Sequence, residues 1–529
     1  MILPIVKERV GTGGKCRIPT TVTYSFAEGC DIAVLGAEAF ATFAPGAEKS
    51  ENGFVRFLFD GALEERAEIY KLKVLEDGIE VSFRDARGAV NGAATAALLL
   101  RKPELETLEI VDYPSFSYRS VMIDMARGLP TWEDMEYAVR YAALAKLNRL
   151  HLHLMDSRGL CYLSDVVPEI TYAESSCDKA FIRGLVELCR SYAIEIVPEI
   201  EIPAHATKLC EAHPEFKCEV PSTNGWALCA GAEGVLPLFD KLIGEITELF
   251  PGSEYIHIGS DEIEFRDIPG ERYCYWDDCP RCAALRAREG LKDRQEEYYY
   301  LVNRVHELVL SHGRKMMMWG DQIDVSRDEV PLSRDILVEF WRVAGRGRGP
   351  HDGCSLEKLL EHGFTVVNAY YPYTYFDEDG YMTSEKMKTW TPLTNPETSA
   401  KHHAQIIGGE ACAWEYGNYA NYPFYPVVTP AALALFGDKV WAGGEREHGE
   451  QFRAALSELL FGDGSLADVF DYIGALLPPT TKDKLTFAEP ESLSRSGALE
   501  CASRLRACGK TDAAKSYALR LEKIGDSLK

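Results

Sequence analysis

Residues 255–262 read Tyr255-Ile256-His257-Ile258-Gly259-Ser260-Asp261-Glu262, a short apolar run that ends in two adjacent carboxylic acids. A run of this length, closed by a turn residue such as glycine, is typical of a buried β-strand. The sequence therefore predicts that two carboxylates follow directly after a buried strand.

Seven other stretches share this pattern. Together the eight predicted strands are Val121–Met125, Arg149–Leu154, Ile194–Ile200, Tyr255–Ile258, Lys315–Trp319, Leu337–Trp341, Thr365–Ala369 and Gln405–Gly409. Helical stretches separate most of them, namely Trp132–Leu147, Ala180–Ala193, Val235–Phe250 and Gln295–Ser311. Eight apolar strands alternating with helices over roughly 325 residues predict a (β/α)8 TIM barrel. A doubly wound open sheet is the alternative, but we find no glycine-rich phosphate loop after any of these strands.

Two flanking regions have other patterns. Residues 1–112 contain alternating strand signals and one Ala-rich helical stretch, which predict a small N-terminal α+β domain with helices on one face of a sheet. Residues 113–445 form the predicted catalytic barrel. Residues 446–529 carry apolar residues at helical spacing and predict a C-terminal helical region. The predicted fold class is thus α/β, with three domains.

Composition narrows the class of protein. The chain has 529 residues, 46% of them hydrophobic, and a formal net charge of −25. Such acidity disfavours nucleic acids and anionic membranes as partners, since both require a basic surface. No apolar run reaches the ~18 residues of a membrane span, and the N-terminus lacks the features of a signal peptide, so we expect a cytoplasmic enzyme. The fifteen cysteines follow no disulfide rhythm and are expected to be reduced.

Polar residues recur where the predicted strands end. The first four strands end in sequences containing Asp124 and Arg127, His153 and Asp156, Glu201 and His205, and Asp261 and Glu262. Tryptophans end three later strands, at Trp319, Trp341 and Trp414. The carboxyl ends of barrel strands form the active site of such enzymes. Carboxylates combined with stacking aromatics favour a carbohydrate ligand.

Two of these features allow more than one interpretation. Adjacent Asp261 and Glu262 can occupy different environments, so that one is ionised while the other is protonated. The same dipeptide would also serve as a helix N-cap. His151 and His153 alternate with leucines, so at least one of them is expected in the barrel core.

The motifs resemble those of glycoside hydrolase family 20, the β-N-acetylhexosaminidases. Residues 257–262 are similar to the family's H-x-G-G-D-E, and residues 146–156 match K-x-N-x-L-H-x-H-x-x-D. Residues 198–205 resemble P-E-[IL]-[DE]-x-P-G-H, and residues 408–415 resemble G-G-E-A-x-x-W followed by Glu. The resemblance runs from about Tyr118 to Trp441.

This resemblance implies a catalytic mechanism in which the substrate's own 2-acetamido oxygen is the nucleophile. Glu262 would be the general acid and later the base, and Asp261 would stabilise the oxazolinium-like ion. Tyr375 would donate a hydrogen bond to the acetamido oxygen, although Tyr370, Tyr371 and Tyr373 lie in the same loop. The mechanism requires no cofactor and no metal.

The resemblance also assigns the substrate-binding residues. Arg119 would hold the sugar's O3 and O4, and Asp377 and Glu415 would bind hydroxyls. The remaining members are Asp156 and His205 at the wall of the site and Trp319, Trp341 and Trp414 around the acetamido methyl group. Departures from the family pattern are Gly128, Ser157, Ala204 and Ser260, and Glu415 lacks the usual residue between it and Trp414.

One cysteine cluster follows the catalytic stretch. Cys274, Cys279 and Cys282 have the spacing Cys-x4-Cys-x2-Cys, and three thiols with a fourth ligand would bind zinc. Because we find no second Cys-x2-Cys, we expect reduced, packed thiols here.

The sequence therefore predicts a retaining exo-β-N-acetylhexosaminidase that acts on oligosaccharides or glycoconjugates with a terminal N-acetylhexosamine. The alternatives are a catalytically silent sugar-binding protein, a barrel glycosidase with a carboxylate nucleophile, and a metal-dependent hydrolase using His151, His153, His205 and Asp156. The choice between GlcNAc and GalNAc, the linkage, the aglycone and the oligomeric state stay open, with a homodimer as one expected state.

Overall fold

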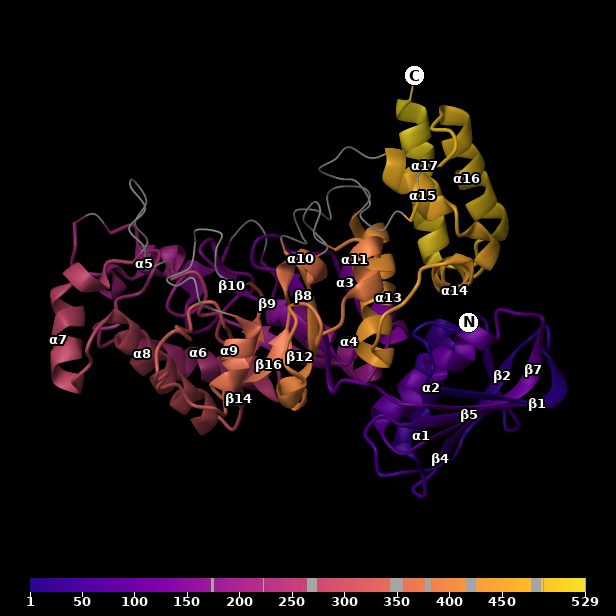
Figure 1. Cartoon of the computed structure of the whole chain (residues 1–529), viewed down its shortest axis with the longest axis horizontal. Helices are drawn as coiled ribbons and strands as arrows, with labels where there is room; N and C mark the ends of the chain where they lie inside the picture. Colours follow the sequence, from indigo (N-terminus) through magenta and orange to yellow (C-terminus); the bar gives the residue numbers. More distant parts are fainter. Residues whose placement is uncertain are drawn as a thin grey trace.

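The computed structural model describes residues 1–172, 176–221, 223–263, 274–342, 355–375, 382–414, 425–476, 487–488 and 490–528. It contains a barrel, an N-terminal α+β part and a group of C-terminal helices (Figure 1). In Figure 1 the N-terminal sheet and the C-terminal helices lie beside the same end of the long axis, and the barrel occupies the rest.

Eight parallel strands close the barrel, which confirms the predicted fold class. They are β8 (Tyr118–Asp124), β9 (Arg149–His153), β12 (Glu195–Glu199), β13 (Tyr255–His257), β14 (Lys315–Trp319), β15 (Leu337–Phe340), β16 (Thr365–Asn368) and β17 (Ile406–Ala413). Each predicted strand overlaps one of these. The largest extension is in β17, which continues to Ala413 and pairs with β8 to close the ring.

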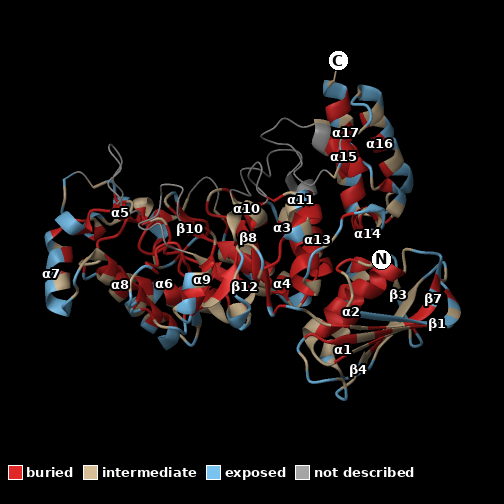
Figure 2. Ribbon diagram, in the orientation of Figure 1, coloured by how far each residue is buried: buried red, intermediate tan, exposed pale blue. Residues whose placement is uncertain are grey.

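Helices surround the barrel as the alternating pattern requires. They include α3 (Trp132–Leu144), α4 (Lys179–Ser191), α6 (Val235–Leu249), α8 (Arg294–Ser311), α9 (Leu356–Glu361) and α13 (Tyr425–Ala442). The sequence sets their starts: Thr131 and Asp134 form a reciprocal capping box at α3, and Asp178 caps α4. In α4, Ile182, Leu185 and Cys189 are buried at helical spacing. The buried strands and inner helix faces are red in Figure 2.

The barrel interior has an apolar layer, a polar layer and an aromatic layer. The apolar layer consists of Tyr118, Val197, Met317, Leu337 and Val367. The polar layer contains His151, Glu199, His257, Glu339 and Glu410, all without exposed side-chain surface. The aromatic layer is built on Met122, Trp319, Ala369, Tyr375 and Cys412. The polar layer contacts the aromatic layer through Trp319, which packs against His257 and donates to Glu199.

The N-terminal part is a seven-stranded sheet in the order β1-β7-β5-β6-β4-β2-β3. Its strands are β1 (Glu8–Arg17), β2 (Thr23–Phe26), β3 (Glu48–Lys49), β4 (Val55–Phe59), β5 (Tyr70–Leu75), β6 (Gly78–Phe83) and β7 (Glu104–Asp112). In β5, Tyr70, Leu72 and Val74 are buried and the residues between them are half-buried. Helices α1 (Asp31–Phe43) and α2 (Ala86–Leu99) contact the sheet and each other.

The C-terminal region is helical, with α14 (Glu450–Phe461), α15 (Val469–Leu476), α16 (Arg495–Cys508) and α17 (Asp512–Ser527). The apolar pattern that runs from Leu499 to Leu521 is divided between two antiparallel helices. The division falls at residues 509–511, where Thr511 caps α17 through its side chain.

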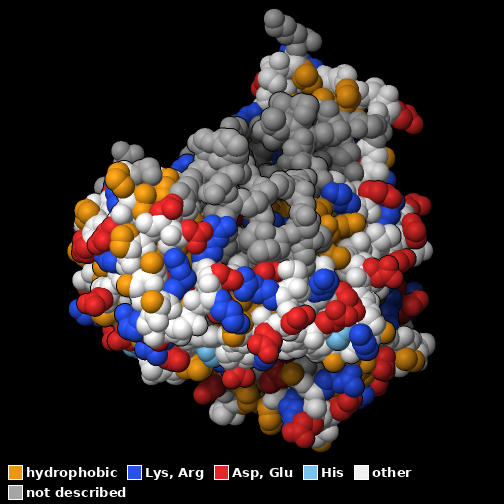
Figure 3. Space-filling model, turned by 60° about the vertical axis from the view of Figure 1, so that its left-hand side comes forward, with side chains coloured by type: hydrophobic (Ala, Val, Ile, Leu, Met, Phe, Trp, Pro, Cys, Tyr) orange, Lys and Arg blue, Asp and Glu red, His pale blue; other side chains and the backbone are white. Residues whose placement is uncertain are grey.

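Among the described residues, no helix is both long and apolar enough to cross a membrane. On the described part of the face in Figure 3, acidic and basic side chains are interspersed.

Candidate active site

The carboxylate pair lies at the carboxyl end of the barrel, directly after β13. The backbone there is left-handed at Gly259 (φ +60°), Ser260 (φ +73°) and Glu262 (φ +46°). A Cβ at Gly259 would lie 1.8 Å from a carboxylate oxygen of Glu201, so only glycine fits. Non-glycine residues in this conformation are strained and are concentrated at functional sites.

The serine that departs from the family pattern has its own support. Ser260 is fully buried, and its Oγ lies 3.0 Å from the hydroxyl oxygen of Tyr298. Tyr298 in turn donates to the Ser260 carbonyl oxygen at 2.9 Å. Two contacts to one tyrosine thus fix the backbone next to Asp261. Residues 261–263 are not helical, which excludes the helix N-cap interpretation of the pair.

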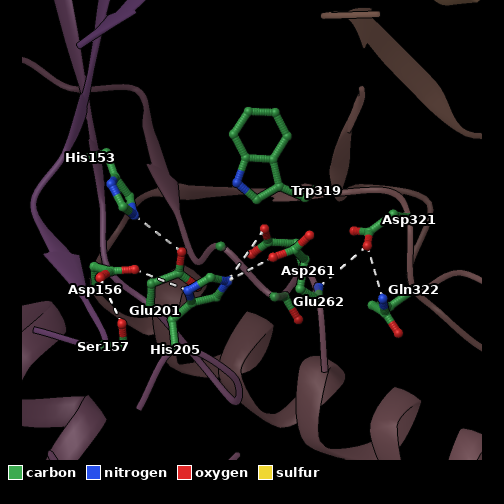
Figure 4. A network of polar contacts seen from close by, with 12 residues as sticks. His153, Asp156, Ser157, Glu201, His205, Asp261, Glu262, Trp319, Asp321 and Gln322 are labelled. Carbon is green, nitrogen blue, oxygen red and sulfur yellow. Dashed lines mark hydrogen bonds and ion pairs between the residues drawn. The ribbon is translucent and has the colours of Figure 1, made fainter. Parts of the chain in front are cut away.

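A histidine connects the pair to the neighbouring loops (Figure 4). His205 Nδ1 lies 3.0 Å from Asp156, and its Nε2 lies 3.7 Å from both Asp261 Oδ2 and Glu262 Oε2. Burial lowers the pKa of His205, but the carboxylates around it, Asp261 first, raise the pKa well above its usual value. The surroundings of His205 therefore favour its protonated form, and its Nε2 faces the side chains of both Asp261 and Glu262.

Asp156 is held as an anion by the same arrangement. Burial alone would raise its pKa, but the hydrogen bond to His205 and the charge of Arg127 hold the pKa well below the usual range. Arg127 Nη2 lies 3.0 Å from Asp156 Oδ2, and Arg127 Nη1 lies 3.1 Å from Asp124 Oδ2.

Glu262 is surrounded differently from Asp261. Desolvation, followed by the charge of Asp261, raises the pKa of Glu262. The Glu262 amide donates to Asp321 at 3.3 Å, and Arg342 lies 2.7 Å from Asp321 and 3.7 Å from Glu262 Oε1. Trp226 donates to the Glu262 carbonyl oxygen at 2.9 Å. The two backbone contacts fix the position of Glu262, while desolvation and Asp261 raise the pKa of its carboxyl group.

Asp261 has an oxygen available to a ligand. Its Oδ1 is buried and accepts no hydrogen bond from the residues that the structure describes. Nearby, desolvation and the charge of Asp261 raise the pKa of Glu201 to about 8, and Glu201 lies 3.3 Å from His153 Nε2. A buried carboxylate oxygen of this kind can accept a hydrogen bond from a polar ligand atom.

An aromatic cluster lies next to the loop that carries the carboxylates. It consists of Trp319, Trp341, Trp414 and Tyr375. The Trp341 and Tyr375 rings are stacked with centroids 6.4 Å apart, and the Trp319 and Trp414 rings are 5.9 Å apart. The Trp319 backbone amide donates to the Gly259 carbonyl oxygen at 3.0 Å, two residues before Asp261, and Trp319 and Asp261 are labelled in Figure 4. The four aromatics predicted from the sequence are thus brought together.

The polar layer of the barrel interior holds Trp319 of the aromatic cluster by a hydrogen bond. Trp319 Nε1 donates to Glu199 at 2.7 Å, and Glu199 also contacts His257 at 2.9 Å and His151 at 3.0 Å. Burial lowers the pKa of His151, but the charges of Glu410 and Glu199 raise it to about 9. Both histidines of the β9 pattern are fully buried and partnered, since His153 contacts Asp124 at 2.7 Å.

The structure corrects the position of the substrate-binding arginine. Arg119 lies near the start of β8, at the opposite end of the barrel from Asp261 and Glu262. It is fully buried and ion-paired with Glu68 of the N-terminal region, so it does not reach the site. Arg127, after the end of β8, lies 5.0 Å from the Trp414 ring centroid and contacts Asp156. The direction of the strand could have shown this from the sequence, because active sites form at carboxyl ends.

Asp377 and Glu415 lie outside the described residues. The structure adds Asp321, Arg342 and Trp226, which the sequence interpretation had not assigned to the site, and it places Glu201, named there only as a polar strand end, beside His153. Asp321 and Arg342 follow β14 and β15, so the rule of polar strand ends could have identified them. Trp226 lies in a long loop and carries no such signal.

Residues 116–441 match the family described as "Glycosyl hydrolase family 20, catalytic domain". The chain belongs to glycosyl hydrolase family 20. The resemblance seen in the motifs is thereby confirmed.

Family 20 relatives agree with this assignment. The β-hexosaminidase of Porphyromonas gingivalis is 26% identical over 433 residues, covering 74% of this chain and 53% of that protein. This chain thus spans about half the length of that relative. The β-hexosaminidase of Akkermansia muciniphila is 26% identical over 435 residues, covering 74% of this chain and 82% of that protein.

Solved structures of family 20 members share the fold. The exo-β-N-acetylglucosaminidase of Vibrio harveyi, in complex with N-acetylglucosamine, has a TM-score of 0.70 at 21% identity, covering 87% of this chain and 77% of that one. The β-N-acetylhexosaminidase of Bacteroides fragilis has a TM-score of 0.70 at 23% identity, covering 87% and 95%.

Proposed function

We propose that this family 20 protein is a retaining exo-β-N-acetylhexosaminidase that releases terminal β-linked GlcNAc or GalNAc. The observation that carries the proposal is a pair of adjacent carboxyl groups with different surroundings, next to the aromatic cluster of Trp319, Trp341, Trp414 and Tyr375. Glu262 has a raised pKa, whereas Asp261 presents a buried oxygen without a donor among the described residues. A carboxyl group with a raised pKa and a second carboxyl group next to it suit acid catalysis with charge stabilisation.

In this mechanism Glu262 protonates the leaving oxygen while the 2-acetamido oxygen attacks the anomeric carbon. Asp261 stabilises the positive charge that develops on the acetamido nitrogen. Glu262 then takes a proton from water, which opens the oxazolinium-like ring and gives retention. The mechanism uses no cofactor.

The other side chains bind and orient the sugar. Tyr375 donates to the acetamido oxygen, and the three tryptophans enclose the methyl group and the sugar ring. Arg127 takes the hydroxyl-binding role first given to Arg119, with Asp377 and Glu415 also binding hydroxyls. His205 and Asp156 hold the wall beside the catalytic pair. We further propose that residues 1–112, 113–445 and 446–529 are separate domains.

Hydrolysis of p-nitrophenyl glycosides tests the proposal. Wild type should release p-nitrophenol from the β-N-acetylglucosaminide or β-N-acetylgalactosaminide and not from the β-glucoside. Glu262→Gln should lose about 10²–10⁴-fold in kcat/KM. The loss should be larger for a methyl glycoside, because a poor leaving group depends more on the acid.

Glu254→Gln is the matched control, since Glu254 precedes β13 at the other end of the barrel and pairs with Arg149 and Lys315. It should retain wild-type turnover. Folded wild type that binds the sugars without hydrolysing them would instead indicate the silent sugar-binding protein. Hydrolysis of the β-glucoside would indicate a carboxylate nucleophile.

A further inference from the structure

Four buried cysteines from two loops converge beside the active site. Cys218 and Cys229 lie between β12 and α6, and Cys279 and Cys282 lie at the start of α7 (Pro280–Glu289). Their sulfur atoms all lie within 4.8 Å of one another. Cys229 Sγ is 3.6 Å from both Cys279 Sγ and Cys282 Sγ. Of the three cysteines that the sequence spacing singles out, Cys279 and Cys282 belong to this cluster, whereas Cys274 is buried outside it.

The geometry of the cluster suits one kind of ligand. Four sulfurs that surround zinc tetrahedrally at ~2.3 Å are separated from each other by about 3.8 Å. The two measured sulfur separations are close to that value, and none of the fourteen described cysteines forms a disulfide. The residues Cys279-Pro280-Arg281-Cys282 supply the Cys-x2-Cys spacing that zinc sites use at the start of a helix.

We propose that Cys218, Cys229, Cys279 and Cys282 bind one zinc ion. Four protein thiolates fill a tetrahedral site and leave no position for water, so the ion is structural and not catalytic. The four cysteines lose their protons when the metal binds.

The site joins the segment between β12 and α6 to the start of α7. Trp276 donates to the Leu228 carbonyl oxygen at 2.8 Å, and Arg281 donates to the Glu215 carbonyl oxygen at 2.7 Å. At Gly231 a Cβ would lie 2.4 Å from the Arg281 backbone, so the two loops are in direct backbone contact.

The joined loops also reach the catalytic pair. Trp226, three residues before Cys229, donates to the Glu262 carbonyl oxygen, and its ring is 4.5 Å from the His205 ring. The zinc ion therefore stabilises the wall that carries Trp226 and His205. The zinc ion takes no part in the proposed hydrolysis, so zinc binding can be tested without an assay of hydrolytic activity.

Metal analysis of the purified, reduced full-length chain tests the proposal. We expect about one zinc ion per chain in wild type and in Cys274→Ser, a matched variant of a buried cysteine outside the cluster. Cys282→Ser should contain less than a tenth of that amount. If Cys282→Ser does not fold, wild type can be titrated with a mercurial reagent, and a chromogenic chelator should detect zinc release as the thiols react.

Cobalt provides a second readout. Wild type reconstituted with Co²⁺ should show the intense thiolate-to-cobalt charge-transfer absorption of a tetrahedral sulfur site. Zinc-free, reduced wild type that binds neither metal would overturn the proposal. So would zinc retained at the wild-type level in Cys282→Ser, or disulfides among these four cysteines in protein purified without oxidant.

Discussion

Two arginines near β8 allow the sequence-based and structure-based assignments to be separated. We consider Arg119→Gln and Arg127→Gln. Arg119 is fully buried, and its guanidinium donates to both carboxylate oxygens of Glu68, one of them at 3.2 Å. Glu68 also accepts from Asn148 at 2.8 Å and is itself 4% exposed.

The magnitude follows from what the first substitution leaves behind. Without Arg119, Glu68 stays buried with amide donors and the more distant Arg87, 3.8 Å away. Removing one partner of a buried ion pair costs about 3–5 kcal/mol. At ~2.1 cal/mol/K per residue over a barrel of roughly 330 residues, that loss lowers Tm by about 4–7 °C. Because Arg119 lies at the far end of the barrel, KM should change by less than about twofold.

Arg127→Gln should differ from Arg119→Gln in its kinetics. It leaves the buried Asp124 and Asp156 without the Arg127 cation, so Tm should fall here too. The Arg127 side chain is also 19% exposed and lies 5.0 Å from the Trp414 ring centroid, so it is available to a sugar hydroxyl. A hydrogen bond from a charged group contributes about 1.5–3 kcal/mol, so kcat/KM should fall by roughly 10- to 100-fold. Thermal unfolding followed by circular dichroism, together with p-nitrophenyl glycoside kinetics, measures both effects. A large KM increase in Arg119→Gln with unchanged Tm would refute this assignment.

Three further predictions concern the site itself. Asp321→Asn removes a charge that raises the pKa of Glu262 and frees Arg342 to approach Glu262. The alkaline limb of the kcat/KM–pH profile should therefore move to lower pH, with kcat reduced about tenfold. An unchanged profile would contradict this positioning role of Asp321. In wild type, kcat/KM should fall as pH rises through the raised pKa of Glu262. Because folding raises this pKa, ionised Glu262 disfavours the folded state, so Glu262→Gln should be at least as stable as wild type above the usual carboxyl range. Denaturant titration at pH 5 and pH 8 measures the two free energies of unfolding. Trp414→Ala removes an indole from the aromatic cluster and should raise the KM of an acetamido glycoside about tenfold to a hundredfold. Trp132→Ala is the control, since Trp132 is exposed outside the site, and it should leave KM unchanged.

The barrel could be predicted because its strands are buried on both faces. Parallel strands of this kind are continuous apolar runs, and Lys315–Trp319 has the same bounds in sequence and structure. The polar strand ends also included Asp261, Glu262 and the three tryptophans, which the structure brings to the same end of the barrel. These features are local in sequence, so a single chain reveals them.

What could not be predicted depends on contacts between distant segments. Arg119 was misplaced because a match to a family arginine ignored which end of the strand it occupies, and Glu68, its partner, lies 51 residues earlier. The cysteine cluster was seen only in part, since Cys229 lies 50 residues before Cys279 and no periodic pattern connects them. Only the side-by-side packing of the loops after β12 and β13 brings these residues together.

The central claim, that the substrate's acetamido oxygen is the nucleophile, is tested most directly with p-nitrophenyl β-glycosides whose 2-acetamido group carries zero, one, two or three fluorine atoms. Fluorine withdraws electrons from the acetamido oxygen, so kcat/KM of wild type should fall steadily with each fluorine if that oxygen attacks the anomeric carbon. Rates that do not respond to fluorination would contradict the account and indicate that a protein carboxylate attacks instead.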